Sequence, residues 1–199
     1  MIQTFSSTIR RKEMDAVLTC MVDEKIGPGE LNTKLIQTVK EFTGCDGAVA
    51  FRSPAIAFSY VAKALSLEAG TSVMISALAP SWHYTAIKNL GFTPLVLDVR
   101  EEDGLISAGS VQEGIKNGGR LLLVHETMGI VPNLEGLLSF GIPVIEDISH
   151  SVGATLSRSQ EGEEQAASES AQKESAAKKA GMGGLYSILG LESTDTITA

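Results

Sequence analysis

The sequences RLLLVHETMG at residues 120–129 and GIPVIEDISHSVGA at residues 141–154 decide the fold. In each of them a short run of apolar residues ends in a cluster of polar and charged ones. Strands that are apolar at nearly every position are typical of a parallel sheet that helices cover on both faces. Ligands of such sheets bind beyond the carboxyl ends of the strands, so the polar residues that follow each run are the candidates for a site.

Similar apolar runs alternate with helical patterns on both sides of these two stretches. Including the two above, the predicted strands cover residues 48–51, 72–76, 95–99, 121–125, 144–146 and 185–189. The predicted helices between them cover residues 54–67, 81–90, 110–116 and 133–140, and Ser110 with Glu113 forms a capping-box pattern. This alternation indicates βαβ units. We therefore predict a three-layer α/β fold around a mostly parallel sheet.

Two helices are predicted before this region, and one polar segment interrupts it. Apolar residues recur at helical spacing over residues 10–22, and a second stripe runs from Leu35 to Phe42 and ends at Gly44. Residues 157–179 are rich in Ala, Ser, Glu and Lys and lack large apolar side chains. We interpret them as a flexible insertion, with an exposed alanine-rich helix as the alternative. The prediction is a single domain over residues 1–199 that carries this insertion.

Composition restricts the partners and the compartment. The net charge of −8 argues against a nucleic acid or an anionic membrane as the main partner. The two cysteines lack metal-ligand or redox spacing, and no apolar stretch approaches the roughly 20 residues of a membrane span. These features predict a cytoplasmic protein. No glycine-rich fingerprint follows the first predicted strand, which argues against a dinucleotide-binding domain.

Five blocks of sequence together resemble one enzyme family. The blocks AVAFRSPAIAFSYVAKAL, GFTPLVLDV, LLLVHETMG, GIPVIEDISHSVGATL and GLYSI occur in the order and at the approximate distances of the DegT/DnrJ/StrS aminotransferases. The resemblance runs from about Gly27 to the last residue. It implies the large domain of a fold-type I enzyme that depends on pyridoxal phosphate, acts on nucleotide sugars and forms homodimers. Family members continue into a small C-terminal domain, so the predicted domain is an incomplete one.

The resemblance implies roles for three residues. Asp147 matches the carboxylate that pairs with the pyridine nitrogen of the cofactor, a role that keeps the ring protonated and able to accept electrons. His150 matches a position beside the ring and its phenolic oxygen. Ser187 matches a serine that contacts the cofactor phosphate. Without the resemblance, Asp147 would be interpreted as a turn residue, and His150 and Ser187 as packed polar residues.

Two other cofactor positions depart from the family pattern. The phosphate-binding turn, usually Ser-Gly-Thr, is Ser53-Pro54-Ala55 here, which lacks one amide donor and one hydroxyl. The aromatic residue that stacks on the ring would align near Pro80. Trp82 follows two residues later and is the candidate for a shifted stacking wall, although an aromatic residue at a helix start usually packs against the core.

The lysine that forms a Schiff base with the cofactor is missing. Its position, several residues after the last predicted strand, is occupied by Glu192, and a carboxylate cannot form an imine. After Asp147 the chain has lysines only within residues 157–179, at Lys173, Lys178 and Lys179. No residue is therefore predicted to catalyse transamination.

The sequence leaves three hypotheses about function. The first is a relative of the pyridoxal-phosphate-dependent nucleotide-sugar aminotransferases of cell-envelope or polysaccharide synthesis that has lost transaminase activity. The second is a non-catalytic binding or regulatory module that pairs with an intact paralogue. In the third, Glu192 serves as a base in a dehydration, as histidine does in family members that lack the lysine.

Overall fold

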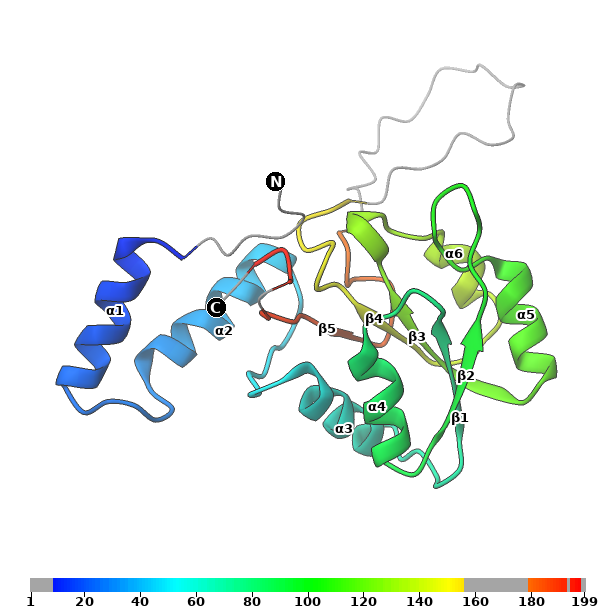
Figure 1. Ribbon diagram of the computed structural model, residues 1–199, viewed down its shortest axis with the longest axis horizontal. Helices are drawn as coiled ribbons and strands as arrows, with labels where there is room; N and C mark the ends of the chain where they lie inside the picture. The colour runs from blue at the N-terminus through cyan, green and yellow to red at the C-terminus, as the bar shows by residue number, and fades with distance from the viewer. Residues whose placement is uncertain (1–8, 156–178, 193, 198–199) are drawn as a thin grey trace, which may run out of the picture.

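The computed structural model describes residues 9–155, 179–192 and 194–197. It contains a five-stranded parallel sheet with the strand order β2-β1-β3-β4-β5 (Figure 1). The strands are β1 (Ser72–Ser76), β2 (Thr93–Leu97), β3 (Gly119–His125), β4 (Val144–Asp147) and β5 (Tyr186–Ile188). The helices are α1 (Arg11–Val22), α2 (Glu30–Thr43), α3 (Pro54–Ala64), α4 (Ser81–Asn89), α5 (Ala108–Lys116) and α6 (Leu134–Leu138), with a 3₁₀ turn at Thr127–Gly129.

Helices cover both faces of the sheet, and each face has its own hydrophobic core. Phe58 of α3 and Ile87 of α4 pack on Val73, Leu123 and Ile145. On the opposite face α5 and α6 pack on the side chains that alternate with these along the strands, and the members of this core include Met74, Val111, Leu122, Leu137 and Val144. The alternation follows from the two-residue period of a strand. The predicted three-layer α/β architecture with a mostly parallel sheet is confirmed.

One predicted strand is absent. Residues 48–51 belong to no helix or strand and pair with no strand in the described part of the chain, so the prediction of a strand there was wrong. These residues and the edge strand β5 line the same cleft instead of sharing a ladder. Val49 is 73% exposed, which explains why apolar character alone misled the prediction. A short apolar run identifies a strand only when a neighbouring strand can take its hydrogen bonds.

The start of α5 also differs from the prediction. The helix begins at Ala108, and the hydroxyl of Ser107 accepts a hydrogen bond from the Ser110 amide at 3.0 Å. Ser110 is therefore inside the first turn and does not cap it with Glu113. The helix does have a serine cap, as the sequence predicted, but the capping residue is Ser107, three residues before Ser110.

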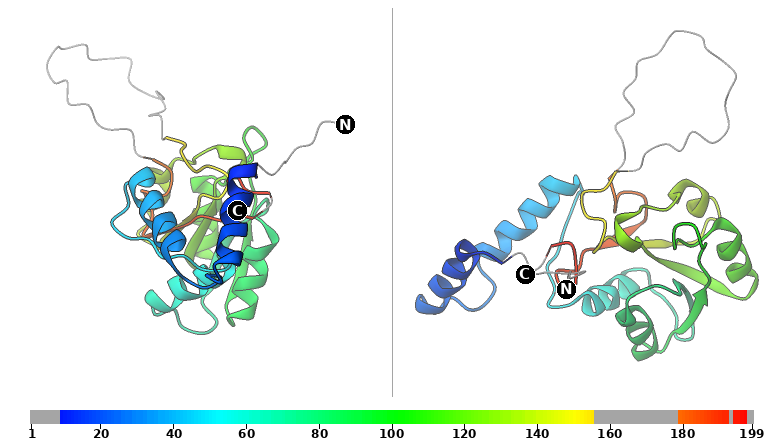
Figure 2. Two further views of the ribbon diagram at one scale, coloured as in Figure 1. Left: turned by 90° about the vertical axis from the view of Figure 1, so that its left-hand side faces the viewer. Right: turned by 45° about the horizontal axis from the view of Figure 1, so that its top comes forward.

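The first two helices project away from the sheet. Neither α1 nor α2 contains a buried residue, and both lie to one side of the α/β layers (Figure 2). The predicted helical stripe of Met14, Val17, Leu18 and Met21 is present on α1, but all four side chains are more than half exposed. The sequence pattern thus identified an amphipathic helix whose apolar face has no cover within the described residues.

In the described parts of the chain, no helix combines the length and apolar character that a membrane crossing requires. The proposed insertion at residues 157–179 lies outside the described residues except for Lys179. That lysine forms an isolated antiparallel bridge with Thr155, donates a hydrogen bond to the Phe42 carbonyl and lies over the Phe42 ring.

Candidate functional site

The carboxylate of Asp147 is the centre of a buried polar cluster at the carboxyl end of the sheet. Its Oδ2 lies 2.8 Å from His83 Nε2 and 3.0 Å from His125 Nδ1. Its Oδ1 accepts hydrogen bonds from the amide of Ser149, at 3.2 Å, and from the Ser149 hydroxyl. Asp147 and His83 are fully buried, and Ser149 and His125 are nearly so. Four donors therefore converge on one carboxylate that water does not reach.

The topology of the sheet explains why these side chains meet. His125 ends β3 and pairs in register with Asp147, which ends β4, so both side chains point to the same face. That face is the one covered by α3 and α4, because Leu123 and Ile145, two residues earlier on each strand, belong to that core. His83 lies in the first turn of α4 and reaches Asp147 from above the strand ends.

The protonation states follow from these contacts. Burial alone would raise the pKa of Asp147, but the hydrogen bonds from His125 and His83 outweigh it and hold that pKa well below its ordinary value. An ionised carboxylate accepts hydrogen bonds only, so His83 Nε2 and His125 Nδ1 must both carry protons. Burial lowers the pKa of His83, although Asp147 opposes the shift. The His83 ring is therefore neutral, and its other nitrogen, Nδ1, has no hydrogen-bond partner among the described residues.

The segment after β5 lies beside this cluster. The amide of Gly190 donates to the Ser149 hydroxyl at 2.8 Å, and the amide of Thr196 donates to the Ser149 carbonyl. Asp195 Oδ1 lies 3.8 Å from His150 Nε2, and the rings of His150 and His125 meet edge to face. Burial raises the pKa of Asp195, the amide of Glu192 opposes the rise and the nearby Asp147 carboxylate adds to it. A second carboxyl group thus stands next to Asp147.

A pair of carboxyl groups occupies the opposite face of the sheet. Glu126 and Glu146 are both fully buried, and each lies next to a member of the Asp147 cluster in the chain. Glu146 accepts hydrogen bonds from the amides of Gly181, Gly183 and Gly184. Burial raises the pKa of Glu126 to about 8; a hydrogen bond from Ser151 opposes the rise, and one shared with Glu146 adds to it. Glu126 is therefore protonated at neutral pH and Glu146 holds the turn before β5.

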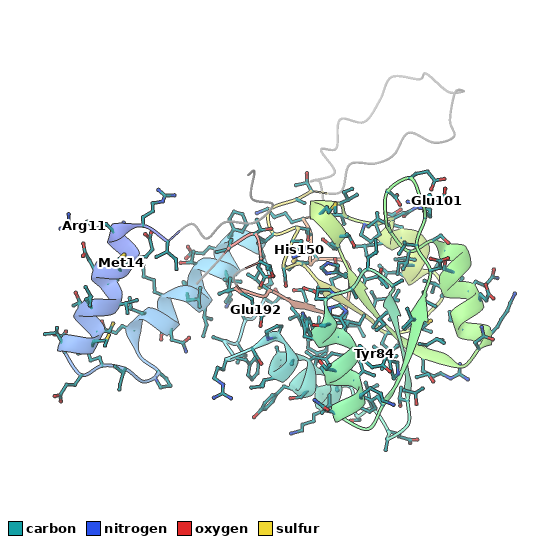
Figure 3. The ribbon with its side chains drawn as sticks, viewed as in Figure 1. Arg11, Met14, Tyr84, Glu101, His150 and Glu192 are labelled. Carbon is teal, nitrogen blue, oxygen red and sulfur yellow. The ribbon has the colours of Figure 1, made fainter. Side chains whose placement is uncertain are left out.

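A large apolar cleft runs along the free edge of β5. Its volume is about 1250 Å³, and its walls come from α2, residues 45–54, α3, β5 and the segment that follows β5. Ser53, Ser187 and Glu192 line it, whereas Asp147 and His150 do not. Figure 3 shows Glu192 between β5 and α2, with its side chain exposed. The predicted site residues therefore divide between this cleft and the Asp147 cluster.

The remaining predicted residues have structural contacts. Ser53 accepts a hydrogen bond from the amide of Ile56 and caps α3, while Ala55 packs against the core on that face. Trp82 is half-buried, packs against the same core and contacts the adjacent His83 ring edge to face. Ser187 pairs in register with Glu146, so it points to the face opposite Asp147. The cofactor roles of these residues stay predictions.

The Asp147 cluster has the composition of a metal site but the spacing of a hydrogen-bonded one. The ligand atoms of His83, His125 and Asp147 lie within 4.8 Å of one another. Ligands around a tetrahedral zinc ion stand roughly 3.3 Å apart, since each is about 2.0–2.1 Å from the metal. The two nitrogens lie closer than that to Oδ2, at 2.8 and 3.0 Å. Hydrogen bonds to an anionic carboxylate account for this spacing without an ion.

These residues do not fit pyridoxal phosphate in the position that the resemblance implies. A carboxylate offers about four acceptor positions, and those of Asp147 are filled by the chain itself. At the phosphate end Ser53 caps its own helix and Pro54 has no N–H. At the position that the resemblance assigns to the Schiff-base lysine, the chain has the carboxylate of Glu192. At all three points, the ring, the phosphate and the imine, these residues therefore differ from the set that the resemblance implies for holding the cofactor.

Sequence reasoning missed the two histidines that hold Asp147. His125 closes an apolar run, and a register-matched polar residue at the end of the neighbouring run would have indicated the contact. His83 gave a weaker signal, because it lies between two aromatic residues, Trp82 and Tyr84, inside a predicted helix and not at the end of an apolar run. Asp195 gave no signal, since its place depends on how the segment after β5 turns back.

Comparisons with known proteins identify the family. A model of the DegT/DnrJ/EryC1/StrS aminotransferase family matches residues 7–183. Among solved structures, Spr1654 from Streptococcus pneumoniae in its PMP form has a TM-score of 0.81 at 15% identity, and the match covers 100% of this chain and 50% of that one. TlmJ, an aminotransferase from Streptoalloteichus hindustanus, has a TM-score of 0.80 at 18% identity, with 100% and 50% covered.

Helicobacter pylori PseC, an aminotransferase involved in the biosynthesis of pseudoaminic acid, has a TM-score of 0.78 at 16% identity, with 98% of this chain and 49% of that one covered. At these identities the structures establish the fold alone, and the chain spans about half their length. The family match covers most of the sequence. This chain belongs to the DegT/DnrJ/EryC1/StrS aminotransferase family.

Proposed function

We propose that this protein is a sugar-aminotransferase relative in cell-envelope or polysaccharide sugar synthesis, with a nucleotide sugar as its ligand, that does not itself transaminate. Family membership supports the sugar-processing role. The observation that supports the loss of transamination is Glu192, which lies exposed in the cleft and which the resemblance assigns to the position of the Schiff-base lysine. An imine forms when an amine attacks the aldehyde of the cofactor, and a carboxylate has no nitrogen with which to form one. Glu192 therefore cannot form the covalent link to the cofactor.

The described lysine that lies nearest to Glu192 in the sequence is held by other contacts. Lys179, the lysine closest in sequence to β5, donates to the Phe42 carbonyl and stacks over that ring. A Schiff-base lysine must instead be held with its amine deprotonated beside the ring of the cofactor. The structure therefore supports a protein whose ligand site is lined by Glu192 and Ser187 and whose chemistry does not pass through an imine.

The test is a comparison of the natural chain with Glu192→Lys, with Glu192→Gln as the matched control. Each protein is mixed with pyridoxal phosphate, reduced with borohydride and mapped by mass spectrometry. Amino transfer from glutamate to a nucleotide-activated keto sugar is measured in parallel. We expect no adduct at a defined residue and no transfer for the natural chain and for Glu192→Gln. A stoichiometric adduct on one lysine of the natural chain, together with transfer, would overturn the proposal.

A second candidate is a non-catalytic module that pairs with an intact paralogue. The observation that favours it is the uncovered apolar face of α1, together with Leu31, Leu35 and Phe42 of α2, which are all exposed. Pairing with a second copy of this chain, as expected from the family, would cover the same face. Co-expression with a paralogue distinguishes pairing with the paralogue from pairing with a second copy of this chain. A heterodimer forms at the expense of the homodimer only if the paralogue is the preferred partner.

A further inference from the structure

Asp147 has no acceptor position left for a ligand. Oδ2 receives His83 Nε2–H and His125 Nδ1–H, and Oδ1 receives both the amide and the hydroxyl of Ser149. A carboxylate has about four lone-pair positions, and all of them are used here. The side chain is also fully buried, so no water-filled approach leads to it.

The donor from His83 is the distinctive one of the four. His125 ends β3, and Ser149 lies in the turn that follows β4, the strand that carries Asp147. His83 comes from the first turn of α4, a helix that approaches the carboxyl ends of the strands from outside the sheet. It brings a flat aromatic ring with an in-plane N–H, which is the same donor chemistry that a protonated pyridine nitrogen would offer.

The His83 ring is held in this place by packing. It is fully buried, Trp82 lies against it at 4.1 Å between ring centroids, and the His125 ring stands at 88° to it. A pyridine ring cannot reach Oδ2 unless this imidazole leaves. Leaving would break a charge-assisted hydrogen bond and would bury a polar ring elsewhere or expose it.

We propose that His83 is a specificity-determining residue that occupies the position on Asp147 a pyridinium ring would need and so excludes vitamin-B6 cofactors from binding there. The proposal deepens the proposed function, because it concerns the same site, but it does not depend on Glu192. A chain without the lysine could still hold the cofactor non-covalently through Asp147. With His83 present, that mode is closed as well.

The test uses pyridoxamine phosphate, which has the pyridine ring and the phosphate but no aldehyde to react with surface lysines. Binding to the purified full chain is measured by calorimetry for the natural protein, His83→Ala, His83→Gln and Tyr84→Ala. We expect no saturable binding to the natural chain. His83→Ala removes both the ring and the donor and should bind pyridoxamine phosphate saturably. Its affinity should be at least about tenfold above the detection limit that the natural chain sets, the factor of one charge-assisted hydrogen bond. The gain should disappear when Asp147→Asn is added to it.

The other two variants are the controls. His83→Gln keeps an N–H donor and should not bind pyridoxamine phosphate. Tyr84→Ala changes the exposed neighbouring residue of α4 and should not bind it either, because the contact of His83 with Asp147 stays intact. Free imidazole should compete with pyridoxamine phosphate for His83→Ala, because it restores the missing ring. Saturable binding to the natural chain that Asp147→Asn abolishes would overturn the proposal. So would a folded His83→Ala that binds no better than the natural chain.

The outcomes separate this proposal from the proposed function. Non-covalent binding at Asp147 without a reducible adduct would end the His83 proposal and leave the loss of transamination standing. If His83→Ala does not fold, the natural chain and Asp147→Asn decide between the outcomes. Weak, unsaturable binding that is equal in the natural chain and in Asp147→Asn supports the proposal. Saturable binding to the natural chain that Asp147→Asn weakens contradicts it.

Discussion

At the carboxyl end of β3, Glu126 is a fully buried carboxyl group between Ser151 and Glu146. Burial raises its pKa to about 8, Ser151 opposes the rise, and the hydrogen bond shared with Glu146 adds to it. The folded chain therefore holds a proton that the unfolded chain releases near the ordinary glutamate pKa of 4.5. Between these values the native state binds more protons, so stability falls as pH rises.

We predict that this stabilisation is present in full below the unfolded pKa and is lost as pH rises through about 8. The free energy of unfolding in urea should be higher at about pH 6 than at about pH 9 for the natural chain. Glu126→Gln keeps the size of the side chain and cannot ionise, so its stability should change less over that interval. Glu101→Gln, at an exposed position, is the control. An unchanged pH dependence in Glu126→Gln would show that another group releases the proton.

The residue scale also shows what the sequence could predict of the site. Asp147 and His150 were identified through their place after an apolar run, and both lie in or beside the buried cluster. Glu126 was a candidate by the same rule, whereas Glu146 was placed inside a predicted strand, and their pairing follows only from the register of β3 and β4. His125 lies opposite Asp147, so the neighbours of each, Glu126 and Glu146, must share the other face. The missing information was the register, which apolar runs alone do not give.

At the scale of the elements, the strands of the sheet were predictable to within two residues, and the segment at residues 48–51 was not. β1 was predicted with its bounds correct, and β3 and β4 to within two residues, because side chains buried on both faces leave a continuous apolar run. β2 begins two residues earlier than predicted, at Thr93, an exposed residue that the apolar pattern could not include. Residues 48–51 are as apolar as the strands of the sheet, but no neighbouring strand forms hydrogen bonds with them in the described part of the chain.

The cap of α5 gives a test at this scale. The Ser107 hydroxyl accepts a hydrogen bond from the Ser110 amide, whereas the Ser110 hydroxyl contacts the Ser107 hydroxyl. We predict that Ser107→Ala lowers the free energy of unfolding by about 1 kcal/mol, the usual cost of losing an N-cap. Ser110→Ala should cost clearly less, since alanine favours the helix interior. Urea unfolding of the two variants compares them, and a larger loss in Ser110→Ala would restore the capping box that the sequence suggested.

At the scale of the whole molecule, the α/β layers and the first two helices differ in how they are stabilised. The layers bury two apolar cores on the two faces of one sheet. In contrast, α1 and α2 bury no residue, although α1 presents Val17 and Leu18 at 60% and 55% exposure. An isolated helix of this length is marginal in water, so α1 needs a partner surface to be stable. A contiguous exposed apolar face of this kind marks an interaction site.

We therefore predict that the chain self-associates through α1, as dimers do across a shared apolar face. Leu18→Glu places a charge in the centre of that face and should convert the dimer into a monomer in sedimentation, with a loss of helical signal in circular dichroism because α1 then has no cover. Lys12→Glu also changes charge on α1, but at an exposed polar position, and should leave the dimer intact. The parallel sheet does not depend on α1, so both variants should keep the same unfolding transition of the α/β layers. A natural chain that sediments as a monomer at high concentration would show that α1 is covered by a different protein, which is the outcome that a paralogue partner requires.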